Sequence, residues 1–139
     1  MSAILTIEEG AVCQGSLERL REFYEEGVRM MTLTWNYPND LAWPNRLDPQ
    51  TGHMTPETGK GADREGAAFI EEMERLGMII DVSHLGDAGF WDIAKRARKP
   101  FIASHSNSRS EAGHVRNLTD EMIRALADRG GVMGINYYT

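Results

Sequence analysis

The chain has 139 residues and a mass of 15.6 kDa, which fits one domain, and 41% of its residues are hydrophobic. A formal net charge of -6 argues against a nucleic-acid binder, which would usually carry a basic stripe. The single cysteine, Cys13, excludes a disulfide framework and a cysteine-based zinc knuckle, and it fits a reducing compartment.

The hydrophobic pattern alternates between short β-branched runs and longer amphipathic runs. In chain order it predicts a strand at 3–7, a helix at 16–27, a strand at 28–35, a helix at 63–77, a strand at 78–83, a helix at 87–98, a strand at 101–104, a helix at 119–130 and a strand at 131–138. Five strands that alternate strictly with four helices predict a parallel sheet with right-handed crossovers.

Local signals support these boundaries. Ser16 and Thr119 are suited to cap the helices that follow them, because their side-chain oxygens can accept from the first free amides of a helix. The stretch 36–62 is rich in proline, asparagine, aspartate and glycine, and a loop of this length is usually a lid or a rim. We expect the acidic run of the second helix to face water; it comprises Glu71, Glu72 and Glu74.

The order of the strands favours part of a barrel over a self-contained open sheet. The sequence has no G-x-G-x-x-G loop and no Walker loop. Both outer strands would be unpaired edges, which are a liability. The predicted fold is therefore α/β, with consecutive βα units of a (β/α)8 TIM-type barrel. Its five parallel strands and four helices form a partial barrel in a single domain over residues 1–139.

Each predicted strand is apolar in its body and closes with a polar or aromatic residue. The closing residues are Glu8, Trp35 with Asn36, His84, His105 and Asn136. Carboxyl ends of parallel strands meet at one rim, where ligands and metals gather in α/β folds. Glu8, His84 and His105 are suited to bind a zinc-like ion there. The alternative is that each is a strand-end side chain bonded to loop backbone.

Further residues near this rim have less specific patterns. Arg116 follows the second histidine strand and is suited to clamp a substrate carboxylate bidentately, or else it is a surface arginine beside the next helix. Trp35 can line a pocket or pack in the core. We expect a structural role for Asp81 within its strand, and we expect His53 and His114 to be exposed.

Several segments, taken in this order and spacing, carry a family resemblance. They are IEEG, RMMTLTWN, RLGMIIDVSHLGD, PFIASHSNSR and HVRNLTDEMIRALADRGGVMGIN. Together they cover nearly the whole chain and resemble the membrane (renal) dipeptidase family of zinc peptidases. The resemblance implies a (β/α)8 barrel that holds two zinc ions and hydrolyses the peptide bond of dipeptides with a metal-bound hydroxide.

The resemblance also implies roles for individual residues. Glu8 matches the glutamate that bridges the two metals, with Glu9 as its direct neighbour. The second zinc would be held by His84 and His105, so that one site lies largely within this chain. By the same match, Arg116 would hold the C-terminal carboxylate of the substrate. Many members carry a substrate-contacting histidine where this chain has Trp35, which suggests a shifted substrate range.

Two parts of the family pattern have no counterpart here. The His-x-Asp pair of the first zinc and the Asp-Phe-Asp-Gly-like segment with the catalytic aspartate are absent, so we expect no catalytic side chain in this span. A (β/α)8 barrel needs roughly 250 residues. We therefore expect a fragment that is weakly active or inactive alone.

Alternative functions follow from the same residues. Trp35 leaves open another metal-dependent amidohydrolase or lactonase on the same barrel, and the open edges suggest a non-catalytic half-barrel that works only with a second copy or a missing half. The expected ligands are zinc and a small peptide, without nucleic acid. Because no apolar run approaches roughly 18 residues and no signal peptide is recognised, we expect a cytoplasmic protein without a membrane span.

Overall fold

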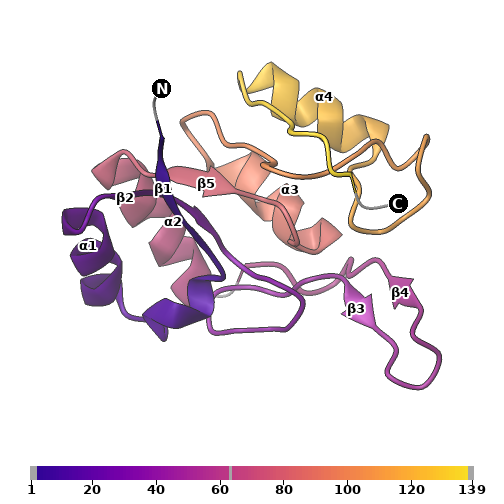
Figure 1. Cartoon of the computed structure of the whole chain (residues 1–139), viewed down its shortest axis with the longest axis horizontal. Coiled ribbons are helices and arrows are strands. Elements are labelled where there is room, and N and C mark those ends of the chain that lie inside the picture. The colour runs from indigo at the N-terminus through magenta and orange to yellow at the C-terminus, as the bar shows by residue number, and fades with distance from the viewer. Residues whose placement is uncertain (1–2, 63, 138–139) are drawn as a thin grey trace.

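Strands and helices alternate through the described part of the computed structural model, which comprises residues 3–62 and 64–137 (Figure 1). The parallel strands are β1 Leu5–Glu8, β2 Val28–Thr32 and β5 Ile79–Asp81. The α-helices are α1 Leu17–Glu25, α2 Arg64–Leu76, α3 Asp87–Arg96 and α4 Asp120–Asp128. A 3-10 helix, η1 Gly10–Cys13, and a hairpin, β3 Arg46–Leu47 with β4 Met54–Thr55, complete the elements.

The strands lie side by side in sequence order, β1-β2-β5, and all pair in parallel. Glu8 pairs with Thr32, and Thr32 pairs with Asp81, so the three residues form one row across the sheet. This arrangement confirms the predicted α/β class with consecutive parallel βα units. Because the row lies at the carboxyl ends of the strands, the residues that follow it meet at one rim.

The predicted strands at 101–104 and 131–138 extend the sheet only through isolated bridges. Asp81 bridges Ile102 and Ala103 bridges Met133, both in parallel. Gly134 belongs to the last segment, and a Cβ there would stand 2.0 Å from the carbonyl oxygen of Ser104. Glycine therefore permits this close approach of two backbones. Tyr138, at the predicted end of the last strand, lies outside the described residues.

Both predicted caps are present. Ser16 Oγ accepts from the amide of Arg19 at 3.4 Å, and Thr119 Oγ1 accepts from the amide of Met122 at 3.3 Å. The first residue of the predicted second helix, Asp63, lies outside the described residues. No helix of the described part is long and apolar enough to cross a bilayer.

The core lies between the strands and the helices. Its largest fully buried side chains include Phe69, Phe90, Phe101, Leu20, Met31, Leu33, Leu41, Ile70, Met73 and Ile93. The prediction that the whole acidic run of α2 faces water is wrong for Glu72. This residue is only 8% exposed, because its side chain turns toward α1 and lies between Arg21 and Arg75.

The long loop is more ordered than the sequence indicates. It contains the β3–β4 hairpin, which projects from the body (Figure 1). The buried side chain of Asn45 fixes its base: Oδ1 accepts from the amides of Glu57 (2.9 Å) and Asp87 (3.2 Å). Its Nδ2 donates to the carbonyl of Val115 at 2.6 Å. One amide side chain thus joins the loop to the start of α3 and to the segment that carries Arg116.

Candidate metal centre

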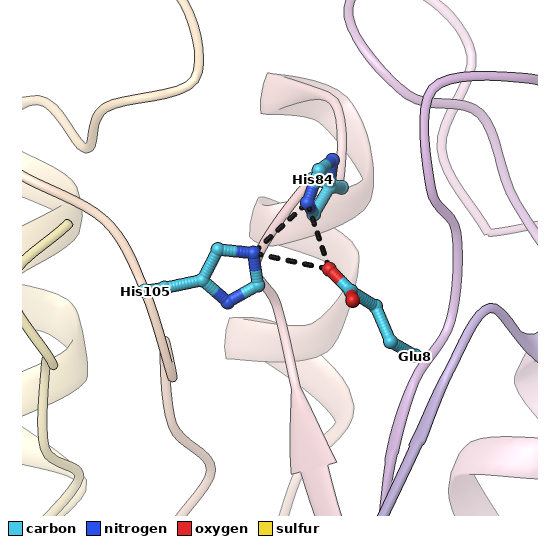
Figure 2. A group of neighbouring side chains, drawn as sticks. All are labelled: Glu8, His84 and His105. Atoms are coloured by element: carbon cyan, nitrogen blue, oxygen red, sulfur yellow. Dashed lines mark hydrogen bonds and ion pairs between the residues drawn. The ribbon is translucent and has the colours of Figure 1, made fainter. Parts of the chain in front are cut away.

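The three predicted metal ligands meet at the rim of the sheet (Figure 2). Glu8 Oε1 lies 3.2 Å from His84 Nε2 and 3.3 Å from His105 Nε2, and the two Nε2 atoms are 2.9 Å apart. Glu8 ends β1, while His84 and His105 follow β5 and the bridged segment at 101–104. Residues separated by nearly a hundred positions are brought together because parallel strands end at one edge.

His84 is held in a specific orientation. Its backbone has a φ of 68°, a left-handed conformation that turns the chain sharply after β5. Its Nδ1 lies 3.0 Å from Asn36 Oδ1. Because a carbonyl oxygen can only accept, Nδ1 carries the proton and Nε2 is free to act as a ligand. Burial, followed by the charges of Arg116 and His105, lowers the pKa of His84 to about 3, so the ring is neutral at neutral pH.

The donor set fits a divalent cation such as zinc. With His105 Nδ1 bonded to Ser104 Oγ at 2.8 Å, both imidazoles direct Nε2 toward Glu8. Three atoms with lone pairs then lie within 4.8 Å of one another. Imidazole with carboxylate is a common zinc ligand set, so the three side chains could hold such an ion together.

Glu8 and Glu9 have different tasks. The Glu9 carboxylate turns away from the histidines and accepts from the amides of Ala11 (3.1 Å) and Trp35 (3.0 Å) and from Asn39 Nδ2 (2.6 Å). These bonds tie the turn after β1 to the turn after β2. Glu9 is therefore a structural residue, and Glu8 supplies the carboxylate at the rim.

A cleft of about 740 Å³ opens beside His84 and His105. It is lined by Trp35, Asn36, Met54, His84, His105, Ala112, Gly113, His114, Arg116, Asn117 and Asn136. Both residues predicted to bind substrate, Trp35 and Arg116, thus face the same cleft. The Trp35 side chain is 42% exposed, and its ring centroid lies 6.0 Å from that of His84. Trp35 is therefore a wall of the cleft and not a core residue.

A second arginine supports the segment that carries Arg116. The Arg109 guanidinium pairs bidentately with Asp87, with both N–O distances 2.8 Å. It also donates to the carbonyls of Asn117 and Val115 at 2.8 and 2.9 Å. Sequence reasoning missed this residue, because its function depends on which carbonyls the loop turns toward it.

The exposure predicted for His53 and His114 is confirmed, and Asp81 makes a cross-strand bond of the kind expected for a structural residue. Asp81 is fully buried and accepts from Thr32 Oγ1 of the neighbouring strand at 2.8 Å, which is a structural role. His53 and His114 are exposed. His114 nevertheless lines the cleft, and its Nδ1 accepts from the amide of Arg116 at 3.1 Å. The sequence predicts Asn36 only as a strand-end residue, whereas in the structure its side chain orients His84.

Comparisons with known proteins give the family that the chain resembles over its whole length. The family model "Membrane dipeptidase (Peptidase family M19)" matches residues 1–139. An uncharacterised protein of the pqqA 5′ region of Klebsiella pneumoniae is 36% identical over 138 residues, which cover 99% of this chain and 49% of that protein. An uncharacterised dipeptidase of Schizosaccharomyces pombe is 37% identical over 123 residues, covering 88% of this chain and 28% of that protein.

Solved structures show the same fold. The chain superimposes with a TM-score of 0.88 and 29% identity on a metallopeptidase from Rhodobacter sphaeroides liganded with a phosphinate mimic of the dipeptide L-Ala-D-Ala. The match covers 98% of this chain and 38% of that one. The chain spans about half the length, or less, of the curated relatives it matches.

Proposed function

The chain belongs to the membrane dipeptidase family, peptidase family M19, and we propose that it supplies zinc ligands and a substrate clamp to an enzyme that hydrolyses dipeptides. The convergence of Glu8, His84 and His105 within 4.8 Å carries this proposal. The phosphinate mimic of L-Ala-D-Ala bound to the related bacterial metallopeptidase supports a dipeptide as the substrate.

Each residue at the rim has a proposed task. Zinc held by Glu8, His84 and His105 would polarise the scissile carbonyl and lower the pKa of water, which supplies the nucleophile. The Arg116 guanidinium would hold the C-terminal carboxylate and so place the peptide bond beside the ligands. Trp35, which also lines the cleft, would limit the space for the side chain of the substrate.

The test is the amount of zinc bound per chain, measured by mass spectrometry of metals. We expect about one zinc in the wild-type chain and a loss of nearly all of it in His84→Ala/His105→Ala, because two of three ligands are removed. His53→Ala is the matched control, because His53 is an exposed histidine outside the cleft. Retention of zinc by the double variant would refute the assignment of the ligands.

The substrate class needs a separate measurement. Dipeptides and lactones offered side by side to the zinc-loaded chain, or to a longer protein that contains it, distinguish the proposed peptidase from a lactonase on the same barrel. We expect hydrolysis of dipeptides, and turnover of lactones alone would contradict the proposal. The two hydrolases share the ligands and differ in what Arg116 and Trp35 contact.

A further inference from the structure

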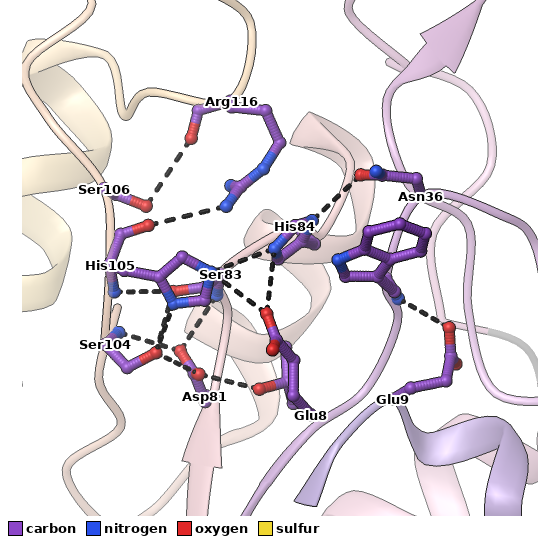
Figure 3. A network of polar contacts seen from close by, with 12 residues as sticks. Glu8, Glu9, Asn36, Asp81, Ser83, His84, Ser104, His105, Ser106 and Arg116 are labelled. Atoms are coloured by element: carbon purple, nitrogen blue, oxygen red, sulfur yellow. Dashed lines mark hydrogen bonds and ion pairs between the residues drawn. The ribbon is translucent and has the colours of Figure 1, made fainter. Parts of the chain in front are cut away.

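Asp81 is the most buried charged group near the rim, with no exposed surface. Its carboxylate accepts four hydrogen bonds, shown in part in Figure 3. The donors are Thr32 Oγ1 (2.8 Å), the amide of Ser83 (3.0 Å), the amide of Ser104 (2.9 Å) and Ser104 Oγ (2.5 Å). Because every one of these contacts is a donor, the carboxylate acts purely as an acceptor, as an ionised carboxylate must.

Because Asp81 only accepts hydrogen bonds, the direction of the Ser104 hydroxyl proton is determined. A hydroxyl has one proton, and the bond from Ser104 Oγ to Asp81 Oδ2 uses it. The remaining contacts of Ser104 Oγ, to Ser83 Oγ at 3.3 Å and to His105 Nδ1 at 2.8 Å, must therefore be bonds that it accepts. His105 Nδ1 is consequently the donor.

A neutral imidazole with its proton on Nδ1 has an unprotonated Nε2, whose lone pair can bind a metal. In His105 that atom is the one directed toward Glu8 at 3.3 Å and toward His84 at 2.9 Å. We propose that Asp81 and Ser104 are positioning residues that fix the tautomer and ring orientation of His105 for metal binding. The inference deepens the proposed function and rests on the metal site described above.

The two histidines are thus oriented by different chemistry. His84 donates to the neutral amide oxygen of Asn36, whereas His105 donates through a hydroxyl to a buried carboxylate. Hydrogen bonding to a carboxylate makes an imidazole a more basic ligand. The same carboxylate also joins β2, β5 and the 101–104 segment, so it sets the spacing of the strand ends as well.

Ser104→Ala separates these two tasks. It removes the hydroxyl between Asp81 and the ring, while the amide of residue 104 still donates to Asp81 Oδ1. Ser83→Ala is the matched control, because it removes a neighbouring hydroxyl that contacts Ser104 Oγ at 3.3 Å and the backbone amide of His105 at 3.1 Å, while the bond between Ser104 Oγ and the His105 ring is kept. Ser104→Thr keeps the hydroxyl and should restore the wild-type behaviour.

The first readout is the tautomer of His105 in the metal-free full chain. Long-range proton–nitrogen NMR spectra at mildly alkaline pH should show one tautomer, protonated at Nδ1, in the wild type, Ser83→Ala and Ser104→Thr. In Ser104→Ala they should show a mixture. An unchanged single tautomer in Ser104→Ala would overturn the inference. If Ser104→Ala does not fold, Ser104→Cys, which keeps the size and weakens the hydrogen bond, decides in the same way.

The second readout is the dissociation constant of zinc. We expect it to rise about 10–100-fold in Ser104→Ala and to stay near the wild-type value in Ser83→Ala and Ser104→Thr. Equal affinity of Ser104→Ala and wild type would overturn the inference and leave the proposed function intact. A wild-type chain that binds no zinc would contradict the proposed function, and the tautomer comparison would still decide the inference.

Discussion

The charged guanidinium of Arg116 lines the cleft and is partly buried. Burial lowers the pKa of its guanidinium to about 10, against the raising effect of Asp81 and Glu8, so the group stays charged at neutral pH. Within the described residues, its recorded side-chain hydrogen bond is a long one, from Nη2 to the carbonyl of His105 at 3.5 Å. A charged guanidinium with further free donor groups, beside the candidate metal centre, is suited to bind a carboxylate.

Replacing this arginine should change affinity without changing the metal. We expect Arg116→Lys to weaken binding of a dipeptide to the zinc-loaded chain by about tenfold or more, because a lysine cannot form the bidentate pair. Calorimetric titration measures the effect. The same dipeptide with a C-terminal amide is the control ligand, since it lacks the carboxylate. Equal preference for acid over amide in wild type and Arg116→Lys would contradict the assigned contact.

For single residues, the sequence predicts the candidate ligands better than the residues that orient them. The convergence of Glu8, His84 and His105 could be predicted because each ends or follows an apolar run, and the strand ends of a parallel sheet meet at one edge whatever their side chains are. Asn36 and Ser104 orient the rings through single hydrogen bonds of 3.0 and 2.8 Å. Such bonds depend on side-chain rotamers that no local pattern encodes.

Between elements, the main charged contact joins α1 to α2. Glu72 Oε1 lies 2.6 Å from Arg21 Nε, and Glu72 Oε2 lies 2.7 Å from Arg75 Nε. Hydrogen bonding by Arg75, opposed in part by burial and aided by Arg21, lowers the pKa of Glu72 to about 2. The periodicity of α2 alone predicts that the side chain of Glu72 faces water. The pairing partner comes from another helix, which is why the prediction was wrong.

The Glu72 contact should make stability depend on pH. A carboxyl whose pKa is lower in the folded state stabilises the fold above its unfolded pKa, 4.5, and this contribution is lost as the pH falls toward about 2. We expect Glu72→Gln to lower the free energy of unfolding by about 1–2 kcal/mol at neutral pH and by almost nothing at the acid end. The two arginines are half exposed or more, which keeps the value modest.

Urea unfolding of both proteins across that pH range measures the difference. Glu71→Gln is the matched control, because Glu71 is an exposed neighbour on the same helix. A stability difference between Glu72→Gln and wild type that persists at the acid end would contradict an electrostatic origin of the contact.

For the whole molecule, the two outer edges of the sheet carry exposed apolar side chains. At the β1 edge, Ile4 and Leu5 are 60% and 57% exposed. At the other edge, Val132, Ile135 and Tyr137 are 68%, 66% and 96% exposed. Single exposed apolar residues are ordinary, but in the described residues 3–62 and 64–137 they are concentrated along the two outer edges of one sheet, which favours pairing with another chain.

We therefore expect the 139-residue chain to self-associate through these edges. In sedimentation, its apparent mass should rise above 15.6 kDa as the concentration increases. Leu5→Lys/Ile135→Lys should shift the protein toward the monomer, because lysine on an edge strand opposes pairing. Leu47→Lys is the control, because Leu47 is 49% exposed but lies in the β3–β4 hairpin. A folded species of monomer mass at every concentration would show that the exposed edges do not pair.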